Sequence, residues 1–320
     1  MNIQTQLIYE LDNRPTRECH ASTIAETKSG LIAGWFGGVG ESHPTVGIWL
    51  SHNNGSGWSK PVEVTNAEKT GVTGGATCWN PVLFQPKNGP LMLFYKVGFK
   101  IRSWQSVLMI SSDDGVTWSE PRILEDRVFG PVKNKPIELN DGTILCPTSD
   151  EATGWEVFFS MTNDLGKTWR KVGPCNDSAM HSCIQPSLLT YPDGRIQALC
   201  RTRHSRVGEF WSNNNGKTWT DFNLTNIIGN NSGLDAVTLR DGQQLLVNNP
   251  IEADWGSRNI LAISSSADGK NWKQVCLLEN EPEGEYSYPA IIQSKDGKVH
   301  ITYTYRRESV KYAVFDPAEL

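Results

Sequence analysis

Six polar side chains recur at matched places in the sequence, and their types suit the recognition of a sugar. Each of these side chains stands at the start of a short segment that consists of an apolar run, a glycine-containing turn and a second apolar run. The six residues are His20, Asn80, Lys135, Gln185, Asp235 and Tyr288. A purely structural position would repeat one residue type, so six different polar residues at equivalent places indicate a shaped ligand site. The alternative is that they cap strand starts beside a water-filled channel.

The far ends of the same segments add aromatic, amide and guanidinium side chains. Aromatic faces stack on the C–H surfaces of sugars, while bidentate donors hold hydroxyls or a carboxylate. Lys133, Lys135 and Arg201 favour an acidic sugar. We expect the substrate-binding residues to be Trp35, Asn80, Lys133, Lys135, Gln185, Arg201, Arg203 and Arg306.

The elements that must position these residues are short β-strands in a repeated order. Each segment has two β-rich runs separated by turn residues such as Asp-Gly, which predicts a hairpin. A second motif, best seen as Ser112–Trp118 (SDDGVTW), follows the hairpins and recurs every 50 to 60 residues. Its polar turn residues and closing Trp predict two further strands joined by a stabilising turn.

Four strands repeated six times, without helical periodicity, predict an all-β fold, a six-bladed β-propeller that fills residues 1–320 as a single domain. The last hairpin lacks its own Trp-closed box, and a strand-like segment, NIQTQLIYE, precedes the first hairpin. We expect the N- and C-terminal segments to complete one blade together, which removes a free sheet edge.

The repeated box resembles the Asp-box (BNR) repeat of the sialidase and neuraminidase superfamily, and the resemblance covers essentially the whole chain. The segments HASTIAE, NPVLF, IQPSLL, NSGLDAV and EYSYPAIIQ look like the group described as predicted neuraminidases. The resemblance implies a sialidase-like propeller whose active site lies where the inner strands converge. Asp boxes also occur in propellers without sialidase activity, so fold alone does not fix the reaction.

Sialidases hold the sialate carboxylate with three Arg, and use a Tyr nucleophile paired with Glu and an Asp as acid/base. Here Cys19–Ser22 stands where the first Arg is expected, and the loop Gly37–His43 offers Glu41 but no Asp. Arg201 or Arg203 matches the second Arg and Arg258 the third. Because the set is incomplete, a different and acidic sugar is favoured over sialic acid.

The leading prediction is an exo-acting glycoside hydrolase that releases a terminal sugar from a glycan. By the logic of sialidases, a neutral Tyr nucleophile avoids repulsion by an anionic substrate. The catalytic candidates are Tyr286 or Tyr288 as nucleophile, Asp235 or Glu285 as its base, and His20 or Glu41 as proton donor. A uronate-directed lyase and a non-catalytic carbohydrate-binding propeller are the two alternatives.

Composition excludes several other classes. A net charge of -5 and a pI of 5.7 argue against a nucleic-acid partner. No apolar stretch is long enough to span a membrane and no signal peptide opens the chain, so we expect a soluble protein, cytoplasmic or secreted with its signal removed. We expect most of the seven cysteines to be buried thiols, and no cofactor and no metal site.

Overall fold

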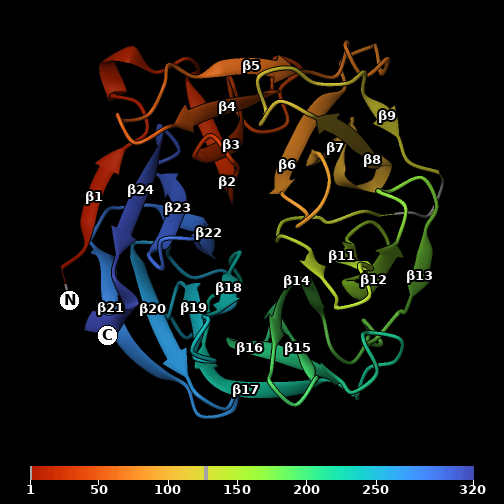
Figure 1. Cartoon of the computed structure of the whole chain (residues 1–320), viewed down its shortest axis with the longest axis vertical. Helices are drawn as coiled ribbons and strands as arrows, with labels where there is room; N and C mark the ends of the chain where they lie inside the picture. Colours follow the sequence, from red (N-terminus) through yellow and green to blue (C-terminus); the bar gives the residue numbers. More distant parts are fainter. Residues whose placement is uncertain (1, 126–128) are drawn as a thin grey trace.

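Six four-stranded antiparallel sheets stand around a central axis in the computed structural model, which describes residues 2–125 and 129–320 (Figure 1). The sequence-based prediction of a six-bladed β-propeller is therefore confirmed. The strands of each blade are given from the innermost outward. Blade 1 contains β2 (Glu18–Glu26), β3 (Leu31–Gly38), β4 (Gly47–Asn53) and β5 (Val62–Thr65), and blade 2 contains β6 (Thr77–Phe84), β7 (Leu91–Gly98), β8 (Gln105–Ser111) and β9 (Arg122–Ile123). Blade 3 contains β10 (Ile137–Glu138), β11 (Ile144–Asp150), β12 (Glu156–Thr162) and β13 (Arg170–Val172).

The remaining blades follow the same order, except that blade 6 takes its outermost strand from the start of the chain. They are blade 4 with β14 (Cys183–Thr190), β15 (Ile196–Thr202), β16 (Arg206–Ser212) and β17 (Asn223–Ile228); blade 5 with β18 (Asp235–Thr238), β19 (Gln244–Asn248), β20 (Ile260–Ser266) and β21 (Lys273–Asn280); and blade 6 with β22 (Tyr286–Gln293), β23 (Val299–Tyr305), β24 (Ser309–Phe315) and β1 (Gln4–Leu7). Three short 3-10 helices, Leu11–Asn13, Ile101–Ser103 and Pro317–Glu319, lie outside the sheets.

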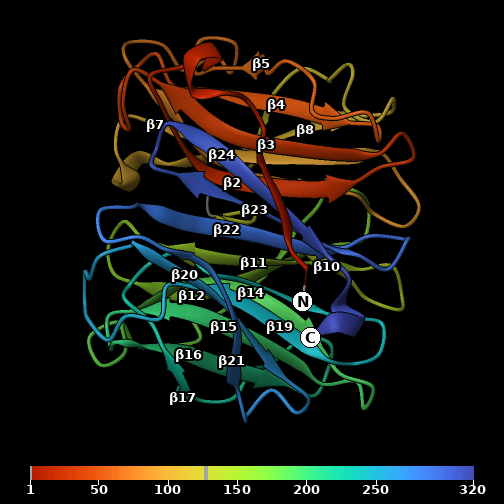
Figure 2. The same ribbon diagram turned by 90° about the vertical axis from the view of Figure 1, so that its left-hand side faces the viewer.

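The two ends of the chain meet in blade 6. Strand β1 pairs antiparallel with β24 from Gln4↔Val314 to Leu7↔Lys311, and both termini lie side by side in Figures 1 and 2. This pairing ties the first and last segments into one sheet, so the ring closes through backbone hydrogen bonds.

The core lies between neighbouring blades. Every residue of β7 is buried, because each face of a middle strand is covered by the adjacent sheet, whereas both residues of β9 on the outer rim are exposed. Burial on both faces explains why the middle strands are nearly continuous apolar runs in the sequence. The part of the chain that the structure describes contains no helix long and apolar enough to cross a membrane.

The Trp-closed boxes are turns held by their own side chains. In blade 2 the Asp113 carboxylate accepts from the Thr117 amide at 2.8 Å and from the Thr117 hydroxyl at 2.6 Å, while Trp118 Nε1 donates to the Gly115 carbonyl at 3.1 Å. These hydrogen bonds lower the pKa of Asp113 to about 2. The local bonds make the box a structural unit.

The boxes and the starts of the inner strands lie at opposite ends of the blades. Each box follows the third strand of its sheet, so antiparallel pairing places it at the end where the innermost strand finishes. Figure 2 shows the strands running between these two faces of the ring. The matched polar residues therefore gather on the face away from the boxes.

Candidate active site

Four of the six inner strands begin with the same local distortion. Ala21, Asn80, Gln185 and Tyr288 have positive φ angles of 55°, 20°, 54° and 52°, and the pairing register shifts beside each of them. A bulge of this kind re-aims a side chain, and positive φ in non-glycine residues concentrates at functional sites. In three of the four strands a proline follows and removes a ladder donor.

This equivalence refines the alignment of the repeats. The residue in blade 1 that matches Asn80, Gln185 and Tyr288 is Ala21, and His20 lies one position earlier. His20 is only 3% exposed, and its ring packs against that of Tyr288. In blade 1 the side chain that reaches the site is therefore His20, the residue immediately before the bulge position Ala21.

Tyr288 lies at the centre of a cluster of cations. Its phenolic oxygen accepts a 2.7 Å hydrogen bond from Arg201 Nη1, and the Arg258 guanidinium carbon lies 5.4 Å from the Tyr288 ring centroid. The His20 ring packs at 4.1 Å between centroids. Gly233 passes over the Tyr288 ring so closely that a Cβ would lie 3.0 Å from it. The tyrosine is therefore fixed, with its oxygen facing Arg201.

His20 is a neutral base in this environment. Burial and the positive charges of Arg307, Arg258, Arg201 and Lys133 hold the pKa of His20 well below its usual value. Its Nδ1 lies 2.9 Å from Thr304 Oγ1, which fixes the ring. The imidazole is consequently uncharged at neutral pH, so as an acid–base group it starts a reaction without a transferable proton.

Three charged side chains from the loops form a rim beside this cluster. Arg307 pairs with Glu285 at 3.0 Å and with Glu41 at 2.5 Å, and Arg258 lies 3.4 Å from Glu285. Glu41 comes from the β3–β4 loop, Glu285 precedes β22, and Arg307 is in the β23–β24 turn. Tertiary structure thus joins Glu41 and Glu285, two of the predicted catalytic residues, through one arginine.

Two tryptophans flank Arg201, and sequence reasoning had selected neither. The Arg201 guanidinium carbon lies 5.2 Å from the Trp155 ring and 5.5 Å from the Trp255 ring, and Arg201 Nε donates to Asn231 Oδ1 at 2.7 Å. Trp255 is 60% exposed and has a φ of 63°. Both Trp lie in loops between strands at the site end, and that shared position is the signal that would have identified them.

A line of aromatic rings continues from His20 across blades 1 and 2. His20 contacts Phe36 at 5.7 Å, Phe36 contacts Trp79 at 6.3 Å, and Trp79 contacts Trp104 at 5.4 Å between ring centroids. The indole nitrogens of Trp79 and Trp104 are buried without a hydrogen-bond partner among the described residues. These rings form an apolar wall with unused donors on one side of the site.

On the next blades a carboxyl group meets an amide. Glu151 Oε1 accepts from Gln185 Nε2 at 3.1 Å and from Ser149 Oγ at 3.1 Å, and burial raises the pKa of Glu151. Asn80 is buried at the bulge of the neighbouring strand β6. The sequence contained Glu151 at the end of a predicted hairpin, but its type alone did not separate it from other carboxylates.

The segment that precedes β10 of blade 3 donates hydrogen bonds to blades 4, 5 and 6. Lys133 Nζ donates to the Leu234 carbonyl at 2.8 Å and to the Pro289 carbonyl, and Asn134 Nδ2 donates to the Gln185 carbonyl at 2.9 Å. Burial lowers the pKa of Lys133 to about 7. Lys133 therefore ties blades 3, 5 and 6 together through backbone carbonyls.

Asp235 and Lys135 form an ion pair close in sequence to Lys133 and Leu234. Lys135 Nζ lies 2.9 Å from Asp235 Oδ2, which also accepts from the Ile291 amide at 2.9 Å. Ser187 Oγ donates to Asp235 Oδ1 at 2.7 Å. The Asp235 carboxylate, 1% exposed, is thus occupied by three donors from three blades, and the structure does not place it beside the Tyr288 oxygen.

The other predicted residues lie outside the Tyr288 cluster. Tyr286 is fully buried and donates to Glu281 Oε2 at 2.6 Å, and Arg306 pairs with that same carboxylate at 2.5 Å. Trp35 is fully buried against Tyr9, with ring centroids 5.3 Å apart. Arg203 lies at the rim, 3.4 Å from Asp254.

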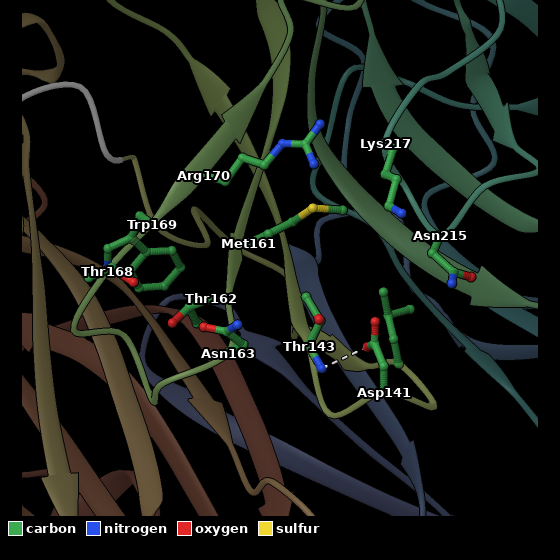
Figure 3. Close-up of a pocket in the computed structure, with 11 residues that line it drawn as sticks. Asp141, Thr143, Met161, Thr162, Asn163, Thr168, Trp169, Arg170, Asn215 and Lys217 are labelled. Atoms are coloured by element: carbon green, nitrogen blue, oxygen red, sulfur yellow. Dashed lines mark hydrogen bonds between the residues drawn. The ribbon is translucent and has the colours of Figure 1, made fainter.

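A separate pocket of about 300 Å³ opens on the box face, between the boxes of blades 3 and 4. Figure 3 shows Arg170 and Lys217 above Met161, with Asp141 on the opposite side. None of its lining residues belongs to the Tyr288 cluster. Within residues 2–125 and 129–320, no group of three or more His, Cys, Asp or Glu side chains has the arrangement of a metal site.

Comparison with known proteins agrees with this architecture. The anhydrosialidase of Macrobdella decora is 24% identical over 219 residues, which are 60% of this chain and 28% of that protein. A leech intramolecular trans-sialidase bound to 2,7-anhydro-Neu5Ac superposes with a TM-score of 0.79 at 15% identity, covering 99% of this chain and 71% of that one. The Hadza microbial sialidase Hz136 gives 0.80 at 18% identity, covering 99% and 69%.

A family match covers most of the propeller. Residues 29–301 match the BNR repeat-like domain, a stretch that includes all five Trp-closed boxes and five of the six inner strands in full. The chain therefore belongs to the BNR repeat-like domain family of the sialidase superfamily.

Proposed function

We propose that this protein is a glycoside hydrolase that removes a terminal, carboxylate-bearing sugar from a glycan. The observation that carries the proposal is the Tyr288 oxygen held by Arg201 at 2.7 Å, with Arg258 over the same ring. Two guanidiniums beside a tyrosine provide a carboxylate clamp next to a nucleophile. The similarity to an anhydrosialidase and to sialidase folds supports the same class of reaction.

The positive charge of the site and an anionic substrate favour tyrosine over a carboxylate as the nucleophile. A carboxylate nucleophile would repel a sugar acid held in the site, whereas a phenol carries no charge until it reacts. Arg201 would stabilise the phenolate as it forms, because it already donates to that oxygen.

In the first step, the Tyr288 oxygen bonds to the anomeric carbon while the glycosidic C–O bond breaks. The phenolic proton passes to the neutral imidazole of His20, and the leaving oxygen takes a proton from a carboxyl group of the site. Water then attacks the anomeric carbon, gives its proton back to that carboxylate, and releases Tyr288, which regains its proton from His20. The balance is one water consumed for each bond cleaved.

The sugar is proposed to be an acid other than sialic acid. The first inner strand supplies Ala21 and His20 where sialidases have an arginine, and Arg307 is paired with both Glu41 and Glu285. Arg201 and Arg258 then form a clamp with two members. A uronate-ended oligosaccharide fits such a clamp.

The experiment is a screen against natural oligosaccharides ending in sialate, uronate or neutral sugars, with mass analysis of products. Tyr288→Phe should lower kcat on the active substrate by on the order of 10³-fold or more, and Tyr286→Phe should retain turnover, since its hydroxyl serves Glu281. Loss of activity in Tyr286→Phe alone would reject Tyr288 as nucleophile. Binding of a sugar acid without any turnover would make the protein a carbohydrate-binding propeller instead.

One observation also favours elimination as a second candidate function. The neutral His20 packed against Tyr288, beside two arginines, is a base next to a carboxylate clamp, and removal of the proton α to a uronate carboxylate needs those groups. Elimination creates an unsaturated sugar that absorbs in the ultraviolet and hydrolysis does not, so the absorbance of the product distinguishes the two reactions.

A further inference from the structure

Glu151 differs from the other carboxyl groups of the site in the way its two oxygens are used. Both of its hydrogen bonds, from Gln185 Nε2 and Ser149 Oγ, end on Oε1. Oε2 has no partner among the described residues. A carboxyl group held on one oxygen keeps the other free to carry and transfer a proton.

The other carboxyl groups that could act as the proton donor form ion pairs with cationic side chains. Glu41 and Glu285 both pair with Arg307, and Asp235 pairs with Lys135. Protonation of any of these three would break an ion pair. Glu151 accepts only from a neutral amide and a neutral hydroxyl, so it can gain a proton without losing a salt bridge.

The groups that face Glu151 come from four strands. Arg201 at the end of β15 and Lys96 on β7 act on it through charge, while Gln185 on β14 and Ser149 on β11 donate to it. Burial lowers the pKa of Lys96 to about 7, so this neighbour is only partly charged at neutral pH. Arg201 links the two halves of the site, since it contacts Tyr288 and also influences Glu151.

We propose that Glu151 is the proton-transferring residue of the hydrolysis: its Oε2 gives a proton to the glycosidic oxygen as that bond breaks and then takes one from the attacking water. Gln185 is the positioning residue, because its amide fixes Oε1 from a backbone held at a φ of 54°. This assignment rests on the proposed function, and it supplies the carboxyl group that the mechanism requires.

Glu151→Gln tests the assignment through the leaving group. On an oligosaccharide, whose leaving oxygen needs a proton, kcat should fall about 10²- to 10⁴-fold. On the 4-nitrophenyl glycoside of the same sugar, whose leaving group departs without a proton, the loss in the cleavage step should be less than tenfold. The neighbouring Asp150→Asn keeps its turn bond to Ala152 and should change neither rate. An equal loss on both substrates in Glu151→Gln overturns the assignment.

A second measurement does not depend on turnover. Calorimetric titration with glucuronate in two buffers of different ionisation heat gives the number of protons that the protein takes up on binding. Because a bound carboxylate disfavours the charged form of a nearby carboxylate, Glu151 should take up a proton near pH 7. The uptake should fall in Glu151→Gln and persist in Asp150→Asn. Unchanged uptake in Glu151→Gln overturns the role of Glu151, whereas absence of turnover in the wild type rejects only the proposed hydrolysis.

Discussion

Tyr288 and Arg201 are 87 residues apart in the sequence and on different blades, yet the phenolic oxygen and a guanidinium nitrogen lie 2.7 Å apart. The same guanidinium is fixed by Asn231 and lies between two tryptophans. Arg201 is therefore preorganised before any ligand arrives, which reduces the entropic cost of binding an anion.

Replacing Arg201 with lysine should weaken the binding of sugar acids. A single ammonium cannot serve both Asn231 and Tyr288 and still present a planar pair of donors. Loss of one charged hydrogen bond costs about 1.5–3 kcal/mol, or roughly 10- to 150-fold in Kd. Calorimetry with glucuronate measures the effect. Its methyl ester is the control, because an equal loss for acid and ester would show that Arg201 does not read the carboxylate.

His20 should make the fold sensitive to acid. Its pKa is lowered in the folded state, so the unfolded chain binds more protons and stability falls as the pH drops below about 6.5. Each pH unit below that value costs about 1.4 kcal/mol until the folded pKa is reached. Urea unfolding between pH 7 and pH 5 should show a smaller loss for His20→Gln than for the wild type.

A second histidine, His300, also contributes to the pH dependence of stability and serves as the control for that experiment. Burial lowers the pKa of His300 to about 4, so His300 contributes acid sensitivity of the same sign far from the site. The variant His300→Gln should reduce the pH dependence without changing the binding of glucuronate. Identical pH dependence of wild type and His20→Gln would mean that folding does not lower the pKa of His20, and would contradict the prediction.

The tryptophans should separate into structural and ligand-binding groups. Trp219 stacks on Phe159 with centroids 3.8 Å apart, so Trp219→Leu should lower the free energy of unfolding by about 2 kcal/mol and leave Kd unchanged. Trp255 is largely exposed at the site, so Trp255→Ala should raise Kd about tenfold and leave Tm unchanged. Measuring Tm and Kd for both variants checks the division, and a reversed pattern contradicts it.

Lys133 should stabilise the ring rather than bind substrate. Lys133→Met removes the donor shared by the carbonyls of Leu234 and Pro289, and two buried acceptors without partners should cost about 2–4 kcal/mol of unfolding free energy. The exposed Lys28→Met is the matched control and should change stability by less than about 0.5 kcal/mol. Urea unfolding compares the two. A selective loss of sugar-acid binding with full stability would restore Lys133 as a ligand-binding residue.

The local parts of the fold could be predicted because their bonds are local. In the Trp-closed box of blade 2, the Asp113 carboxylate accepts from the hydroxyls of Ser111 and Thr117, and polar side chains bond in the same way within the boxes of blades 3, 4 and 5. Such turns leave a fixed pattern in the sequence, and the five boxes together with the six predicted hairpins were sufficient to predict six blades. The hairpin turns are equally local, so the starts of the inner strands could also be located from the sequence.

The sequence by itself determined the propeller and the places where its inner strands begin. Only the tertiary structure decided which of them meet: Lys133 reaches Pro289 across 156 residues and Arg307 reaches Glu41 across 266. The bulges decided the rest, because one residue separates His20 from Ala21, which occupies the bulge position of blade 1. Strand periodicity is two, so one inserted residue reverses which side chain faces the channel, and no local pattern records that choice.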